Sequence, residues 1–84
     1  MKLIYIEWID HVGIGNGWVK KQEALDTKPR IVKEVGWVLG ETKEDITIAA
    51  SLDLSDEKSE FVSDGIVVIK SCVKKKIDLT KYLS

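Results

Sequence analysis

The fold is decided by residues 64–79, which read Asp64-Gly-Ile-Val-Val-Ile-Lys-Ser-Cys-Val-Lys-Lys-Lys-Ile-Asp-Leu79. A run of β-branched residues precedes the pair Lys70-Ser71, and an alternating apolar and polar run follows it. This pattern is typical of two sheet strands joined by a tight turn. The stretch therefore predicts that the chain is built mainly from β-structure.

The second of these strands has a regular alternation. Because successive side chains of a strand point to opposite faces, we expect Val73, Ile77 and Leu79 to face the core. The same alternation places Lys74 and Lys76 together on the opposite face.

Three earlier segments also have strand patterns. Residues 2–10 are apolar on both faces, which predicts a strand buried on both sides. Residues 30–40 alternate, and Gly36 in their middle indicates a sharp bend or a close backbone approach. Residues 46–52 alternate with one apolar face, so we expect a half-buried strand that forms a hairpin with the preceding one.

A short helix is expected between the first two strands. Val19-Lys-Lys-Gln-Glu-Ala-Leu25 contains good helix formers, and Pro29 ends the pattern because proline disfavours helix in the residue before it. Residues 53–60 are polar and predict a solvated loop. The expected fold is mainly β: a small, strongly bent five-stranded sheet or partly open barrel, with one short helix near the N-terminus.

Composition limits the class of protein. With 84 residues, 44% of them hydrophobic and 32% charged, we expect a single folded domain over residues 1–84. A formal charge of -1 does not favour nucleic acid as a partner. One cysteine, the lack of a leader pattern and short apolar runs predict a cytoplasmic protein with no membrane segment. Small size favours homo-oligomerisation.

Catalytic and metal chemistry are not predicted. His11 and Cys72 are the only histidine and cysteine, and neither has partners at the spacing of a metal site or of a nucleophile with its base. We therefore expect no enzyme activity, no metal and no cofactor. Glu7 and Asp10 lie beside Trp8 in an apolar strand, where each makes either a structural hydrogen bond or a ligand contact.

The sequence contains one basic concentration, at its C-terminal end. These lysines either protect an edge strand from further pairing or bind phosphate groups beside an aromatic side chain. Trp37 is expected in the core, on the same face as Val35. A glycine-rich loop adds backbone amides that can bind an anion. The candidate ligand-binding residues are Trp18, Lys70, Lys74, Lys76, Gly15, Asn16 and Gly17.

Four stretches together resemble a known group of proteins. Ile6-Glu-Trp-Ile-Asp10, Gly17-Trp18, Val35-Gly-Trp-Val-Leu39 and Ile66-Val-Val-Ile-Lys-Ser-Cys-Val73 are similar to stretches of small uncharacterised proteins encoded by tailed bacteriophages and prophages. The final strand, turn and strand also look like the end of an Sm-like small barrel, whose bacterial members form rings and bind RNA.

The phage resemblance implies a non-enzymatic binding protein in the host cell cytoplasm. One possibility is a homo-oligomer that sequesters an anionic nucleotide signal used in bacterial defence. A second is a protein-binding module, either an inhibitor of a host factor or a structural adaptor. RNA binding by an Sm-like barrel is a third, which the near-neutral net charge disfavours.

Overall fold

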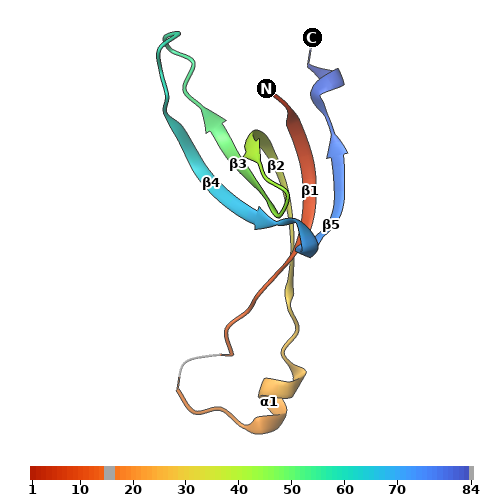
Figure 1. Ribbon diagram of the computed structural model, residues 1–84. Coiled ribbons are helices and arrows are strands. Elements are labelled where there is room, and N and C mark those ends of the chain that lie inside the picture. The colour runs from red at the N-terminus through yellow and green to blue at the C-terminus, as the bar shows by residue number, and fades with distance from the viewer. Residues whose placement is uncertain (15–16, 84) are drawn as a thin grey trace.

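The computed structural model describes residues 1–14 and 17–83 and contains one five-stranded antiparallel sheet in the order β4-β3-β2-β1-β5 (Figure 1). The strands are β1 (Leu3–Asp10), β2 (Arg30–Glu41), β3 (Asp45–Leu52), β4 (Val62–Ile69) and β5 (Val73–Asp78). Helix α1 (Lys21–Asp26) and the short 3-10 turns η1 (Lys70–Cys72) and η2 (Thr80–Tyr82) complete the elements. Among the described strands the sheet is not closed, because β4 and β5 each have one neighbour. The prediction of a mainly β chain with one short N-terminal helix is confirmed.

The core lies on one face of this sheet and joins strands that are not neighbours. Side chains of β1 pack with side chains of β3 and β4, and the cluster comprises Ile4, Ile6, Trp8, Ile46, Ile48 and Val68. Ile6 and Ile48 are almost completely buried. Since β2 lies between β1 and β3, the sheet curves so that one of its faces packs onto itself across β2.

Gly36 of β2 is located where this packing is tightest. A Cβ added there would lie 3.3 Å from the carbonyl oxygen of Ala49 and 3.3 Å from side-chain atoms of Ile48. Gly36 is buried and pairs with Ile4 of β1. The close backbone approach predicted from the mid-strand glycine is therefore confirmed.

The first strand is buried on one face only. Ile4, Ile6 and Trp8 are buried, whereas Tyr5 on the other face is half-buried and Ile9 is exposed. The expectation that both faces are buried was wrong, because a single sheet has no second layer to cover its outer face. For the same reason Trp37, which pairs with Leu3 on the outer face, lies outside the core that it was expected to join.

A β-bulge changes which face of β5 points inward. Lys75 pairs with Glu7, but Val73 pairs with Trp8, so Lys74 is an extra residue in the ladder. Val73 packs against the core as expected, whereas Ile77 pairs with Tyr5 on the outer face and is 40% exposed. The alternation predicted for Ile77 was therefore wrong, because one extra residue reverses the face of every later side chain.

Residues 11–14 and 17–29, which lie between β1 and β2, form an arm. Figure 1 shows the arm with α1 extending away from the sheet, and the molecule measures 54 × 24 × 23 Å along its principal axes. The predicted helix is present as Lys21–Asp26. It ends at Thr27, whose hydroxyl donates a hydrogen bond of 2.9 Å to the carbonyl oxygen of Glu23.

We predict that Gly36→Ala destabilises the protein. The new methyl group must push against a backbone oxygen, and overpacking of this kind typically costs about 1 kcal/mol or more. The melting temperature should fall by roughly 4–8 °C, as measured by circular dichroism.

Gly40→Ala is the matched control in the same strand. A Cβ added at Gly40 meets no atom of the described residues within 4 Å. This variant should melt at the wild-type temperature or slightly above it. Equal melting temperatures for the two variants would contradict the role assigned to Gly36.

Candidate functional site

A groove with an apolar floor and charged rims opens beside η1 and β5. Its larger part is a pocket of about 240 Å³ lined by Ile46, Lys70, Val73 and Lys76. A smaller pocket of about 70 Å³ is lined by Lys2, Ile4, Val38, Glu41, Ile46, Lys76 and Asp78. The two pockets share Ile46 and Lys76, and together they are called the edge groove below.

The edge groove is continuous with the hydrophobic core. Ile4 and Ile46 are core residues, and Val38 and Val73 pack against the core. The rims carry three lysines and two carboxylates. An apolar surface with a few charged groups along it is the usual composition of a site for a small organic ligand.

Two of the lysines singled out from the sequence meet in this groove. The bulge in β5 brings Lys76 opposite Ile6, so it lies on the inner face with Val73. Lys70 begins η1, where its backbone N–H donates a 2.8 Å hydrogen bond to the carbonyl oxygen of Glu44. The expected pairing of Lys74 with Lys76 on one face is therefore replaced by a pairing of Lys70 with Lys76 in one pocket.

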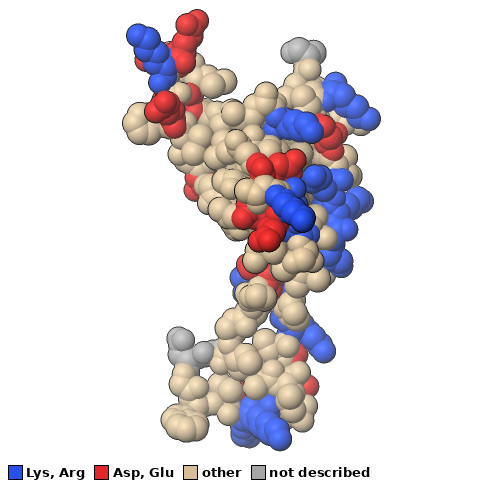
Figure 2. Space-filling view, viewed as in Figure 1, with Lys and Arg blue, Asp and Glu red and all other residues tan. Residues whose placement is uncertain are grey.

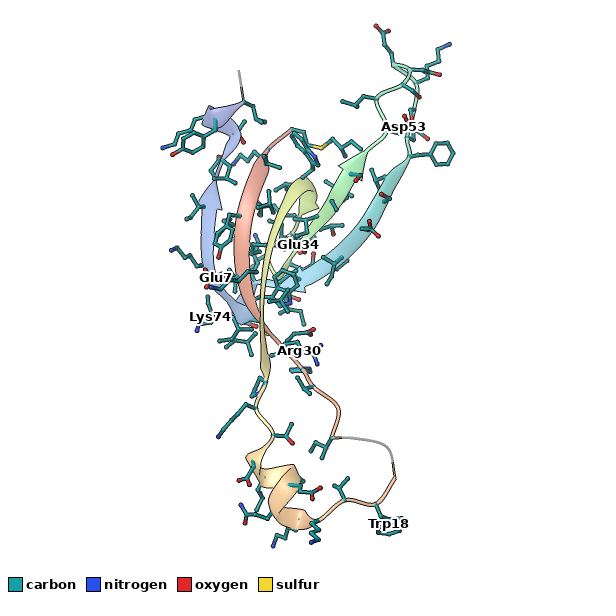
Figure 3. The ribbon with its side chains drawn as sticks, turned by 180° about the vertical axis from the view of Figure 1, so that it is seen from behind. Glu7, Trp18, Arg30, Glu34, Asp53 and Lys74 are labelled. Carbon is teal, nitrogen blue, oxygen red and sulfur yellow. The ribbon has the colours of Figure 1, made fainter. Side chains whose placement is uncertain are left out.

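Lys74 has a different environment. It lies beside Glu7, on the outer face of the sheet, together with Lys75 and Lys33 (Figure 3). Lys74 is not among the residues that line the edge groove. Within one chain, Lys74 cannot act at the same point as Lys70 and Lys76.

A short hydrogen bond organises the outer face around Glu7. The hydroxyl of Tyr5 donates a 2.5 Å hydrogen bond to Oε2 of Glu7. This bond, helped by Lys33, Lys75 and Lys74, holds the pKa of Glu7 below its ordinary value, and it raises the pKa of Tyr5. Of the two roles left open for Glu7, the structure shows the structural hydrogen bond.

Trp18 lies on the arm, far from the candidate lysines of the sheet. Its side chain is fully exposed, and Figure 3 shows it at the end of the arm away from the sheet that carries Lys74. Gly17 next to it has a positive φ of 78°. Gly15 and Asn16, the other members of the predicted loop site, lie outside the described residues. Trp18 therefore reaches the edge groove only if the groove belongs to another copy of the chain.

The only histidine and the only cysteine line one small pocket. His11 and Cys72 border a cavity of about 110 Å³ together with Trp8 and Asp10. No hydrogen bond joins His11 to Cys72 in the part of the chain that the structure describes. Across residues 1–14 and 17–83, no three His, Cys, Asp or Glu side chains gather as they would around a metal ion.

Charge is unevenly distributed over the surface. Figure 2 shows the basic side chains concentrated over β5, whereas the loop between β3 and β4 carries mostly acidic ones. Because the net charge is only -1, the basic region is a local feature of one edge of the sheet. A positive field of this kind attracts anions over a distance of about 10 Å at moderate salt.

The groove contains residues that sequence patterns did not indicate. Lys2, Glu41, Asp78 and Ile46 come from four separate segments, and only the strand register brings them together. Asp78 accepts a 2.8 Å hydrogen bond from the backbone N–H of Thr80, and its hydrogen bonds to Thr80 hold its pKa below the ordinary value. The carboxylate of Asp78 therefore stays ionised at neutral pH.

Comparison with protein-family models, with curated proteins and with solved structures finds no match for this chain. The helices found in the described residues are all too short to cross a membrane.

We predict that Glu7 makes stability depend on pH in the acid range. Because the pKa of Glu7 is lowered from its ordinary value of 4.5, its ionisation stabilises the folded state at pH values above 4.5. This stabilisation is lost as the pH falls through the lowered pKa. In Glu7→Gln, the melting temperature should therefore be reduced at neutral pH and converge with the wild type in strong acid.

Glu57→Gln is the control for this measurement, because it removes one carboxylate from the exposed loop between β3 and β4. Its melting temperature should follow the wild-type pH profile. Parallel profiles for wild type and Glu7→Gln would contradict the contribution assigned to the Tyr5–Glu7 bond.

Proposed function

We propose that this protein is a non-enzymatic binding protein that captures an anionic ligand of nucleotide type in the edge groove. The observation that carries the proposal is that Lys70 and Lys76, from two different elements, line one pocket with Ile46 and Val73. A nucleotide combines a charged phosphate with a large, weakly polar ring. The lysines bind the phosphate as point charges, and the apolar floor of the groove covers one face of the ring.

We propose further that the protein works as a homo-oligomer. The larger pocket has a volume of about 240 Å³, which is below the roughly 300–1,000 Å³ typical of sites that enclose an organic ligand. A second copy would supply the missing wall, and Trp18 and Lys74 are residues that it could contribute. The arm extends away from its own sheet, which supports a contribution to a neighbouring copy.

The open sheet supports association by its edges. β4 and β5 each lack a second neighbour among the described strands, so backbone hydrogen-bonding groups along both are free for another chain. The strongly bent, partly open, Sm-like barrel is part of this proposal, and it is supported by the core that joins β1 to β3 and β4 across β2. In that arrangement, the edge groove would lie next to the contact between copies.

The resemblance to phage proteins gives this binding a biological setting. In an infected bacterium, a small oligomer that holds a nucleotide signal would lower its free concentration and so counter host defence. The site would need no catalytic group, since capture alone removes the signal.

A second candidate function rests on the arm. Trp18 is fully exposed, and the arm also exposes Ile14, Val19 and Leu25, of which Leu25 is 62% exposed. Aromatic residues are enriched among the residues that dominate protein interfaces. This observation favours a protein-binding module, acting on a host factor or as an adaptor.

We predict that Lys76→Gln weakens ligand binding at least tenfold. Loss of one charge-assisted hydrogen bond typically costs about 1.5–3 kcal/mol. The measurement is the rise in melting temperature caused by cyclic dinucleotides, cyclic trinucleotides and ADP-ribose derivatives, together with native mass spectra of the same samples.

Lys75→Gln is the matched control, because it removes the same charge from the neighbouring residue on the outer face. This variant should keep the wild-type ligand shift. An equal loss in both variants would show that only net charge matters, and no shift with any ligand of the panel would remove the proposed function.

For the protein-binding alternative, we predict that Trp18→Ala leaves the melting temperature within about 2 °C of wild type, since an exposed side chain contributes little to folding. It should abolish capture of any specific partner from bacterial extract. Leu54→Ala, at an 81% exposed residue of the β3–β4 loop, is the control and should retain capture. Unchanged capture by Trp18→Ala would exclude the arm as the binding surface.

A further inference from the structure

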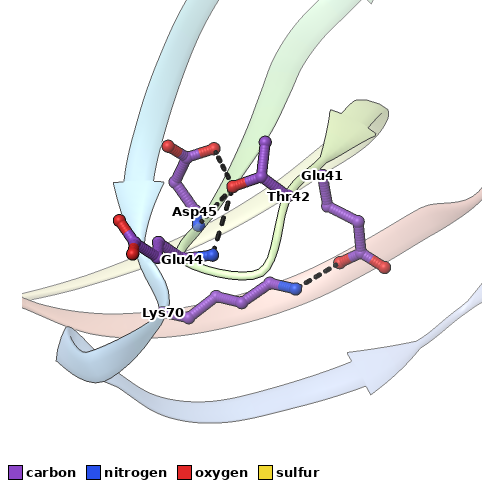
Figure 4. Close-up of polar contacts among 5 residues, drawn as sticks. All are labelled: Glu41, Thr42, Glu44, Asp45 and Lys70. Carbon is purple, nitrogen blue, oxygen red and sulfur yellow. Dashed lines mark hydrogen bonds and ion pairs between the residues drawn. The ribbon is translucent and has the colours of Figure 1, made fainter.

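An ion pair places a carboxylate directly beside one of the groove lysines. Nζ of Lys70 lies 3.4 Å from Oε2 of Glu41 (Figure 4). Glu41 ends β2 and lines the smaller pocket, where Lys76 and Asp78 are its neighbours. A negative group thus stands inside a groove proposed to bind an anion.

The turn after Glu41 is ordered by hydrogen bonds of Thr42. The hydroxyl oxygen of Thr42 accepts hydrogen bonds of 3.1 Å from the backbone N–H groups of Glu44 and Asp45. The same hydroxyl donates a 3.0 Å hydrogen bond to Oδ1 of Asp45. Because the N–H of Lys70 is also bonded to the carbonyl oxygen of Glu44, the turn and η1 are held against each other.

The charges of the edge groove nearly cancel. Lys2, Lys70 and Lys76 face Glu41 and Asp78, which leaves a formal charge of +1. The electrostatic energy of a ligand in this groove is proportional to its own charge, both for attraction to the lysines and for repulsion by the carboxylates. Glu41 therefore takes away part of the advantage that a doubly charged anion would have over a singly charged one.

We propose that Glu41 is a specificity-determining residue, which reduces the preference of the edge groove for a doubly charged phosphate monoester over a singly charged phosphodiester. This inference rests on the proposed function, and it names the class of nucleotide that the groove accepts. Electrostatic mismatch of this kind provides specificity by penalising the wrong ligand. Nucleotides that end in a free phosphate would then compete less strongly than they would in a groove without Glu41.

Two ligands that share base and sugar test the inference. Adenosine monophosphate carries nearly two negative charges at pH 7.5, because its second pKa is about 6, and cyclic adenosine monophosphate carries one. Binding of each is measured by NMR titration of the ¹⁵N-labelled full chain in wild type, Glu41→Gln and Glu44→Gln. Glu44 is the matched control because its carboxylate lies in the same turn and does not pair with Lys70.

In wild type, the formal charge of +1 should leave the monophosphate only a small advantage over the cyclic ligand. In Glu41→Gln, the affinity ratio of monophosphate to cyclic ligand should rise roughly fivefold, which is the effect of one unit charge about 4 Å away in water. Glu44→Gln should keep the wild-type ratio. In the double variant Glu41→Gln with Lys70→Gln, most of this gain should be lost, since Lys70 is the cation that Glu41 offsets.

The outcomes separate this inference from the proposed function. If wild type binds both ligands and Glu41→Gln has the same affinity ratio of monophosphate to cyclic ligand as wild type, the role of Glu41 is overturned. The groove then remains a candidate binding site. A ratio that rises equally in Glu44→Gln also overturns it, because only general charge would then matter. No binding of either ligand by wild type or by Glu41→Gln overturns the role of Glu41, whereas the proposed function is overturned only if the ligand panel described above also gives no shift.

Discussion

Contact between side chains of β1 and β3 across Gly36 is the constraint on which the rest of the structure depends. A sheet normally buries its apolar face against a second layer, but the described residues contain a single short α-helix, and that helix lies away from the sheet. The sheet therefore supplies both sides of its own core by curving over β2. The outer face stays half-exposed, and β4 and β5 remain as edges.

Much of this arrangement could be predicted from local patterns. Alternating β-branched residues indicated the strands, and Pro29 indicated the end of the helical segment. Gly36 indicated the close backbone approach. Each of these signals is contained in a few adjacent residues. The apolar residues on both faces of β1 could not reveal which face is buried. That choice depends on how the whole sheet curves, so Trp8 rather than Trp37 became the core tryptophan.

The candidate site was less predictable than the fold. Lys70 and Lys76 were recognised as part of a basic concentration, but the bulge at Lys74 decided which lysines meet, and bulges have no reliable sequence signal in a run of three lysines. Glu41 and Asp78 could not be foreseen, since they reach the groove through strand register alone. Their negative charge lowers the formal charge of the groove from +3 to +1.

The arm has a consequence for how such a protein can evolve. The arm leaves the sheet after Asp10 and returns at Arg30, and these two residues are paired in the ladder. The strands at the base of the arm are thus joined to each other independently of what lies between them. Insertions, deletions and substitutions in the arm are therefore expected to accumulate with little cost to the core, so that the arm can diverge faster than the β-scaffold.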